Sequence, residues 1–111
     1  MIDIIEDYIE TFGEQTKQRF GILYHLILES TDEPIEEKLW ARIPSFYCGK
    51  SFIRFIPFKD HINIEAKAIM VHKEKCHGYK ITPKGMLKLD HKQEIPVELL
   101  KMIFKESLET K

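Results

Sequence analysis

The sequence predicts an α+β fold, a two-layer sandwich in which helices cover one face of an antiparallel sheet. Residues 43–64 are rich in Phe and Ile, a composition typical of β-strands, and amphipathic patterns typical of helices lie on both sides of them. The connections between the predicted strands are too short for helical crossovers, so neighbouring strands are expected to run antiparallel. A chain of 111 residues, 43% of them hydrophobic, has the size and composition of one ordinary domain, here residues 1–111.

The sheet is expected to run from about Glu37 to Glu65, with a last short strand from Met86 to Leu89. Apolar residues alternate along Leu39–Ile43, Phe52–Phe58 and His61–Glu65, which predicts one buried face and one open face. The open face is expected to mix large apolar side chains with cations. The buried face is expected to carry Leu39, Ala41, Ile43, Ile53, Phe55, Ile62, Ile64, Leu87 and Leu89.

Helices are predicted at both ends of the sequence. Apolar residues at helical spacing indicate a helix over residues 3–12, which Gly13 ends, and a second helix up to about Glu29. Residues 66–75 are expected to form one short helix, and residues 79–85 a loop. Pro96 suits the first turn of a terminal helix. The inward residues of the last two helices are expected to be Ala66, Ile69 and Met70, and then Leu100, Ile103, Phe104 and Leu108.

The charges are distributed unevenly along the chain. Residues 1–37 carry ten acids against two bases, a sum of −8, whereas residues 38–111 carry eight acids and fifteen bases, a sum of +7. The two parts could neutralise each other in the fold, or they could give a bipolar surface that attracts cations on one side and acidic partners on the other.

The composition favours a cytoplasmic protein. The two cysteines form no disulfide framework and no CxxC pair, and the acidic N-terminus does not resemble a secretory signal. No apolar run approaches the roughly 20 residues needed to span a bilayer, so no membrane association is expected.

Carboxylates recur at helical spacing near the N-terminus, at Asp3, Glu6, Asp7 and Glu10. Glu36 and Glu37, at the entry to the first strand, could extend this acidic stripe. Carboxylate oxygens are good ligands for hard or borderline cations such as ferrous iron, and an open, weak site would allow transfer. The stripe therefore predicts a metal site, with a merely solvated helix face as the competing interpretation.

The open face of the sheet is the second candidate site. Trp and Arg often dominate the binding energy of interfaces, and a large exposed apolar patch usually has a partner. His61 follows Asp60 and could act there as a ligand or proton carrier, or simply fix the turn. The residues predicted to bind a partner are Trp40, Arg42, Phe52, Arg54 and His61.

Several blocks of the sequence resemble the YdhG-like family of small bacterial proteins. They are an opening with Ile5, Asp7, Tyr8 and Ile9, a block with Pro44, Phe46, Tyr47, Gly49 and Lys50, then Phe58, Lys59, His61 and Ile62, then Gly78, Tyr79, Lys80, Thr82, Lys84 and Gly85, and last Ile95, Pro96, Leu99 and Leu100. Arg42 and Ile43 depart from the pattern, because family members often have Gly-Met there. The resemblance implies a frataxin-like fold and relatives that act as iron chaperones for iron–sulfur cluster or haem assembly.

The leading hypothesis is a non-enzymatic protein that holds ferrous iron on the acidic stripe and docks on an iron–sulfur or haem assembly partner. The alternative is a metal-free binding module whose open face takes an anionic ligand, a peptide or single-stranded nucleic acid. The slightly negative net charge and the lack of a nucleic-acid motif argue against nucleic acid. No pairing of a nucleophile with a base is visible, which argues against an enzyme. Self-association of the oppositely charged segments into a homo-oligomer also stays open.

Overall fold

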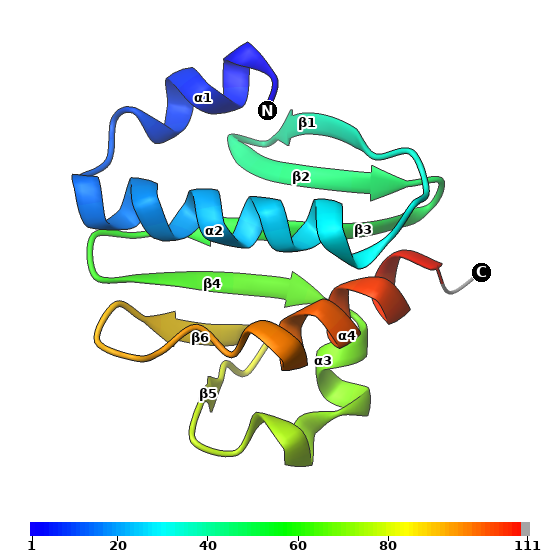
Figure 1. Ribbon diagram of the computed structural model, residues 1–111. Helices are drawn as coiled ribbons and strands as arrows, with labels where there is room; N and C mark the ends of the chain where they lie inside the picture. Colours follow the sequence, from blue (N-terminus) through cyan, green and yellow to red (C-terminus); the bar gives the residue numbers. More distant parts are fainter. Residues whose placement is uncertain (110–111) are drawn as a thin grey trace.

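The computed structural model describes residues 1–109 and confirms the α+β class (Figure 1). Six strands form one open antiparallel sheet in the spatial order β1-β2-β3-β4-β6-β5. The helices are α1 (Asp3–Ile9), α2 (Glu14–Ser30), α3 (Ala68–Val71), the short 3₁₀ helix η1 (Lys73–Cys76) and α4 (Val97–Glu109). The strands are β1 (Glu36–Trp40), β2 (Ile43–Cys48), β3 (Ser51–Pro57), β4 (His61–Ala66), β5 (Lys80–Ile81) and β6 (Leu87–Asp90).

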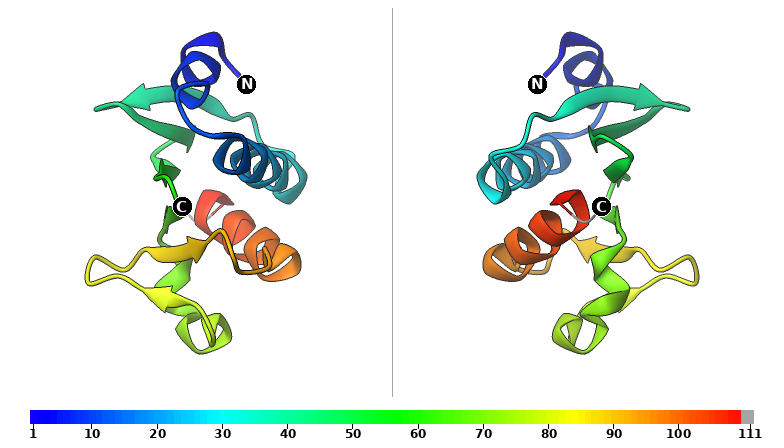
Figure 2. Two further views of the ribbon diagram at one scale, coloured as in Figure 1. Left: turned by 90° about the vertical axis from the view of Figure 1, so that its left-hand side faces the viewer. Right: turned by 90° about the vertical axis from the view of Figure 1, so that its right-hand side faces the viewer.

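Helices α2 and α4 cover one face of the sheet and leave the other face open (Figure 2). Helix α1 lies beside β1, and α3 lies near the opposite edge of the sheet (Figure 1). Alternation along the strands sends apolar side chains into the layer between sheet and helices, because successive residues point to opposite faces. The core residues without solvent exposure include Phe20, Ile27, Phe46, Ile53, Phe55, Ile62, Ile64, Leu87, Leu89, Ile103 and Phe104. The predicted burial of β3, β4 and β6 is therefore confirmed.

The prediction of one strand from Leu39 to Ile43 is wrong. Ala41 and Arg42 have φ values of 48° and 65° and form the two-residue turn between β1 and β2. A turn of this length matches the twist of the strands when both central residues have positive φ, a conformation that is strained for residues other than Gly, Asn or Asp. The strand β2 was therefore missed, Ala41 is exposed, and Ile43 pairs with Trp40. Leu39 and Ile43 are only half-buried.

The segment after β4 also differs from its prediction. Ala66 is the last residue of β4, and the expected helix over 66–75 is divided into α3 and η1. Ile69 is buried as expected, but Met70 is 51% exposed. The predicted loop over 79–85 contains the two residues of β5, which pair with β6 at the edge of the sheet. Among residues 1–109, no helix combines the length and the apolar character that crossing a bilayer requires.

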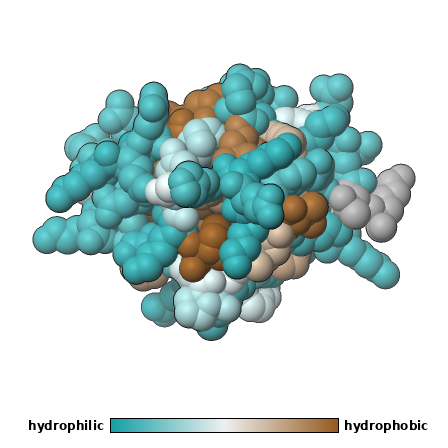
Figure 3. Space-filling view, turned by 90° about the horizontal axis from the view of Figure 1, so that it is seen from below, coloured by the Kyte–Doolittle hydropathy of each residue, from teal (hydrophilic) through white to brown (hydrophobic). Residues whose placement is uncertain are grey.

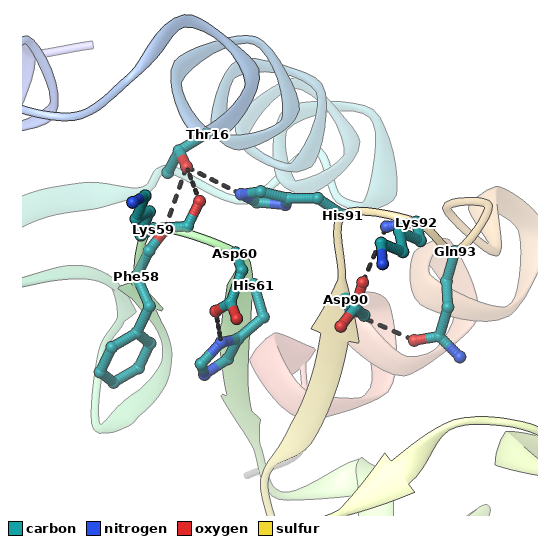
Figure 4. A network of polar contacts seen from close by, with 9 residues as sticks. All are labelled: Thr16, Phe58, Lys59, Asp60, His61, Asp90, His91, Lys92 and Gln93. Carbon is teal, nitrogen blue, oxygen red and sulfur yellow. Dashed lines mark hydrogen bonds and ion pairs between the residues drawn. The ribbon is translucent and has the colours of Figure 1, made fainter.

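A polar network ties α2 to two turns at one end of the sheet (Figure 4). The Thr16 hydroxyl donates to the carbonyl of Phe58 at 3.0 Å, and its oxygen lies within hydrogen-bond distance of His91 Nε2, at 2.7 Å. His91 is buried, and its Nδ1 has no hydrogen-bond partner within the described part of the chain. Burial, followed by the charge of Arg19, lowers the pKa of His91. The network therefore holds a neutral histidine between helix and sheet.

Candidate functional site

The four carboxylates of the predicted acidic stripe are all exposed: Asp3, Glu6 and Asp7 on α1, and Glu10 directly after it. Glu10 is partly occupied, because Lys17 at the start of α2 lies 2.9 Å from its Oε1. Hydrogen bonds to the carboxylates of Glu10 and Glu14 raise the pKa of Lys17, so this lysine stays charged. The helix thus presents a solvated row of acids with one cation at its C-terminal end.

Glu36 and Glu37 do not extend the stripe together, because neighbouring residues of a strand point to opposite faces. The Glu37 carboxylate accepts the backbone N–H of Ile2 at 2.8 Å and the hydroxyl of Tyr24 at 2.6 Å. Burial and the hydrogen bond to Glu37 raise the pKa of Tyr24 to about 12. Glu37 therefore anchors the start of α1 to α2 and β1. Glu36 instead pairs with Lys38, with Oε1 of the glutamate 3.6 Å from Nζ of the lysine.

A surface hollow of about 610 Å³ lies between α1 and α2, and we name it the α1–α2 hollow. Its lining includes Glu6 and Asp7 from α1, Glu10 at the C-terminal end of that helix, and His25 from α2. His25 Nδ1 lies 2.8 Å from the carbonyl oxygen of Gly21, which can only accept a hydrogen bond. In the neutral ring Nδ1 therefore carries the proton, and Nε2 presents its lone pair. Asp3 does not line this hollow.

Within residues 1–109, no three His, Cys, Asp or Glu side chains lie close enough together to form a ready metal centre. The carboxylates and His25 share the α1–α2 hollow without converging on one point. His25 was missed at the sequence level, because only the packing of α2 against α1 brings it near the acidic residues. Its sequence neighbours carry no ligand-spacing signal.

The open face is organised around Arg54 in the middle of β3. Its guanidinium carbon lies 3.8 Å from the ring centre of Phe52 and 4.2 Å from that of Trp40. Arg54 also donates to the hydroxyl oxygens of Ser45 at 3.1 Å and Tyr47 at 3.0 Å. Its Nη1 lies 3.5 Å from Oε1 of Glu65. We call these residues the Arg54 cluster: Trp40, Ser45, Tyr47, Phe52, Arg54 and Glu65.

The Arg54 cluster brings three of the five predicted partner residues together. The side chain of Arg54 is only 11% exposed, whereas the residue Trp40 is 52% exposed and forms the outer wall. The two other residues lie apart from this contact. Arg42 is exposed in the adjoining turn, and its charge partly offsets the burial that raises the pKa of Tyr8 on α1.

His61 begins β4, four positions along the strand from Glu65. Its Nδ1 lies 2.6 Å from Oδ1 of Asp60, and its ring stacks on Phe58 with ring centres 4.4 Å apart. The hydrogen bond from His61 lowers the pKa of Asp60. These contacts fix the turn between β3 and β4 (Figure 4), which was one of the two roles expected for His61.

No protein-family model matches the sequence, and no match was found among curated proteins or solved structures. The resemblance to the YdhG-like family, and the frataxin-like fold that it implies, therefore stay predictions based on the motifs quoted above.

Proposed function

We propose that the protein is a non-enzymatic cytoplasmic carrier that holds a divalent cation, ferrous iron before others, weakly in the α1–α2 hollow. The observation that supports this function is the joint lining of the hollow by Glu6, Asp7, Glu10 and His25. Carboxylate and imidazole are both suitable ligands for ferrous iron. A backbone carbonyl that holds Nδ1–H, as Gly21 does for His25, is a common way to orient a metal-binding imidazole.

The spacing of these ligands argues for weak binding. Because these side chains do not converge on one point, a cation has to draw two or three of them together, and that ordering reduces the affinity. In addition, the ion pair between Glu10 and Lys17 has to break before Glu10 can bind a cation. A carrier that releases its cargo needs an open site of this kind rather than a closed, high-affinity cage.

The acceptor is, on the YdhG-like resemblance, a protein of iron–sulfur cluster or haem assembly. Arg54 already donates hydrogen bonds within its cluster, so it is not free to contact an acceptor. An acidic surface of the acceptor would instead contact the exposed side chains of Trp40 and Arg42. Arg42 lies near Tyr8 of α1, so this contact would adjoin the helix that carries the acids. A second copy of the chain is the competing occupant, and light scattering at low and high salt distinguishes it.

Anaerobic titration with ferrous iron, followed by ¹H–¹⁵N spectra, tests the proposal. Paramagnetic broadening is expected to centre on residues 6–10 and His25. Glu6→Gln combined with His25→Ala should weaken binding about tenfold or more, because two of the ligands are lost. The matched control is Glu98→Gln with His77→Ala, which changes an exposed glutamate and an exposed histidine outside the hollow. Equal affinities in the two double variants would contradict the proposal.

A further inference from the structure

A second hollow lies on the open side of the sheet, where β3 begins and β4 ends. Its volume is about 220 Å³, and it is lined by the β2–β3 turn, the end of β4, the start of α3 and the β5–β6 turn. Lys50, Lys67 and Lys84 reach it from three of these segments, and we name it the lysine hollow. Three cations that are distant in the sequence therefore surround one small space.

The lining of the lysine hollow carries three lysines and one glutamate, and Lys50 and Lys67 also line an adjoining hollow with Glu33 and Glu109. Within residues 1–109, Lys50, Lys67 and Lys84 form no ion pair, although other lysines such as Lys17 and Lys101 do. The single carboxylate of the lining belongs to Glu65, which is paired with Arg54 at 3.5 Å. The lining of the hollow therefore offers these three lysines no free carboxylate.

The backbone around the hollow is shaped by two turns. Gly49 precedes Lys50 with a φ of 61°, and Gly85 follows Lys84 with a φ of 84°. A Cβ atom at Gly85 would lie 3.4 Å from Cγ of Met70, so the β5–β6 turn approaches α3 closely. Glycine permits both the left-handed conformation and this close approach. The turns thus place both Lys50 and Lys84 in the lining of the hollow.

We infer that the lysine hollow binds the phosphate group of a small phosphate monoester. Lysine ammonium groups recognise phosphate as point charges, and a dianion is better matched to three uncompensated cations than a carboxylate is. The volume suits a phosphate with a small organic group, which Phe52 and Met70 can contact. Seen from below, the surface of the protein shows hydrophobic patches separated by hydrophilic side chains (Figure 3).

This site is separate from the proposed metal site. The α1–α2 hollow is lined by residues of α1 and α2, whereas the lysine hollow is lined in part by α3. Helices α1 and α3 lie near opposite edges of the sheet (Figure 1). The two hollows have no lining residue in common. Failure of one proposal therefore leaves the other untouched, provided that phosphate binding is measured without iron.

The test is a titration of the metal-free protein with inorganic phosphate and with phosphoserine, followed by ¹H–¹⁵N spectra. Amide shifts are expected at residues 49–52, 65–67 and 84–85. Acetate, a monoanion, should cause smaller shifts at the same concentration. The variant Lys50→Gln, Lys67→Gln, Lys84→Gln should bind phosphate about tenfold more weakly or worse, since charge-assisted hydrogen bonds are lost.

The control variant is Lys59→Gln, Lys75→Gln, Lys92→Gln, which removes three exposed lysines elsewhere and leaves the same net charge. It should keep the affinity of the parent protein. All six positions are exposed, so circular dichroism should show both variants folded. The inference is overturned if both variants bind phosphate equally well, or if the shifts lie outside the lysine hollow. If phosphoserine binds no better than inorganic phosphate, the site takes the free anion and the monoester assignment is wrong.

Discussion

The two faces of the sheet are formed by the same strands but are stabilised by different interactions. On the helix-covered face, Ile53 and Phe55 of β3 have no solvent exposure and belong to the hydrophobic core. On the open face, Arg54 of the same strand is held between two aromatic rings, two hydroxyls and a carboxylate. The first face is stabilised by the burial of apolar side chains away from water. The second face is stabilised by hydrogen bonds and ring contacts to a cation that is largely withdrawn from water.

The two faces also differ in which substitutions they tolerate. Apolar packing is non-directional, so several hydrophobic side chains of similar volume can replace one another in the core. The Arg54 cluster depends on a planar donor with a fixed geometry, which lysine cannot reproduce. The three predictions below test whether the faces differ in this way, beginning with the largest expected effect.

Phe55→Ala should lower the free energy of unfolding by about 3–5 kcal/mol, because it opens a cavity in the core. The ring of Phe55 lies against Phe20, Phe46 and Phe104, with ring centres 5.6, 5.3 and 5.8 Å away. Urea unfolding followed by circular dichroism measures the loss. Phe52→Ala, on the open face of the same strand, is the matched comparison and should cost clearly less. Equal losses would mean that the open face behaves as a second core.

Arg54→Ala should lower the free energy of unfolding by about 1–3 kcal/mol, because the hydrogen bonds and both ring contacts are lost. Arg54→Lys keeps the charge but loses the planar guanidinium, so it should restore only part of the loss. The control is Lys88→Ala, which removes a half-buried cation from the same face outside the cluster. Full stability in Arg54→Lys would show that charge alone matters, and the contrast between the faces would then weaken.

The smallest expected effect concerns pH and His91, which directly follows β6 and contacts Thr16 of α2. Burial lowers the pKa of His91 in the folded protein, whereas the unfolded chain regains the ordinary value of 6.5. The unfolded state therefore binds a proton first as the pH falls. The stabilising contribution of neutral His91 is complete above about pH 6.5 and is lost as the pH falls through the folded pKa.

Unfolding by urea at about pH 7.5 and about pH 5 measures this dependence, which other histidines and carboxylates also influence. His91→Asn should therefore be compared with His77→Asn, which changes an exposed histidine. We expect the first variant to lose part of the pH dependence and the second to keep it. An identical pH dependence in both variants would show that His91 is not a source of it.

The sequence predicted the core face well because hydrophobic alternation is a local signal. Ile62 and Ile64, or Leu87 and Leu89, reveal their face within three residues. The β1–β2 turn was missed because Ala41 and Arg42 lack the Asn-Gly chemistry that normally marks a two-residue hairpin. A continuous strand was the simpler interpretation of residues 39–43.

The candidate sites were harder to predict because they depend on contacts between distant segments. Helical spacing identified Glu6, Asp7 and Glu10, but nothing local linked His25 to them. The side chain of Glu37 was assigned to metal binding, whereas its geometry ties it to Tyr24 and Ile2. Likewise, successive lysines of the lysine hollow are 17 positions apart along the chain, and only the fold brings the three together.

The position of Trp40 makes the chain's single tryptophan a spectroscopic probe of one face. The residue is 52% exposed and its ring stacks on the guanidinium of Arg54, so its emission in the folded protein should resemble that of a hydrated indole beside a cation. Unfolding then changes its surroundings little, and tryptophan fluorescence should report poorly on global stability. Any macromolecule that covers the Arg54 cluster would instead remove water from the indole, and a blue shift of its emission would follow the docking directly.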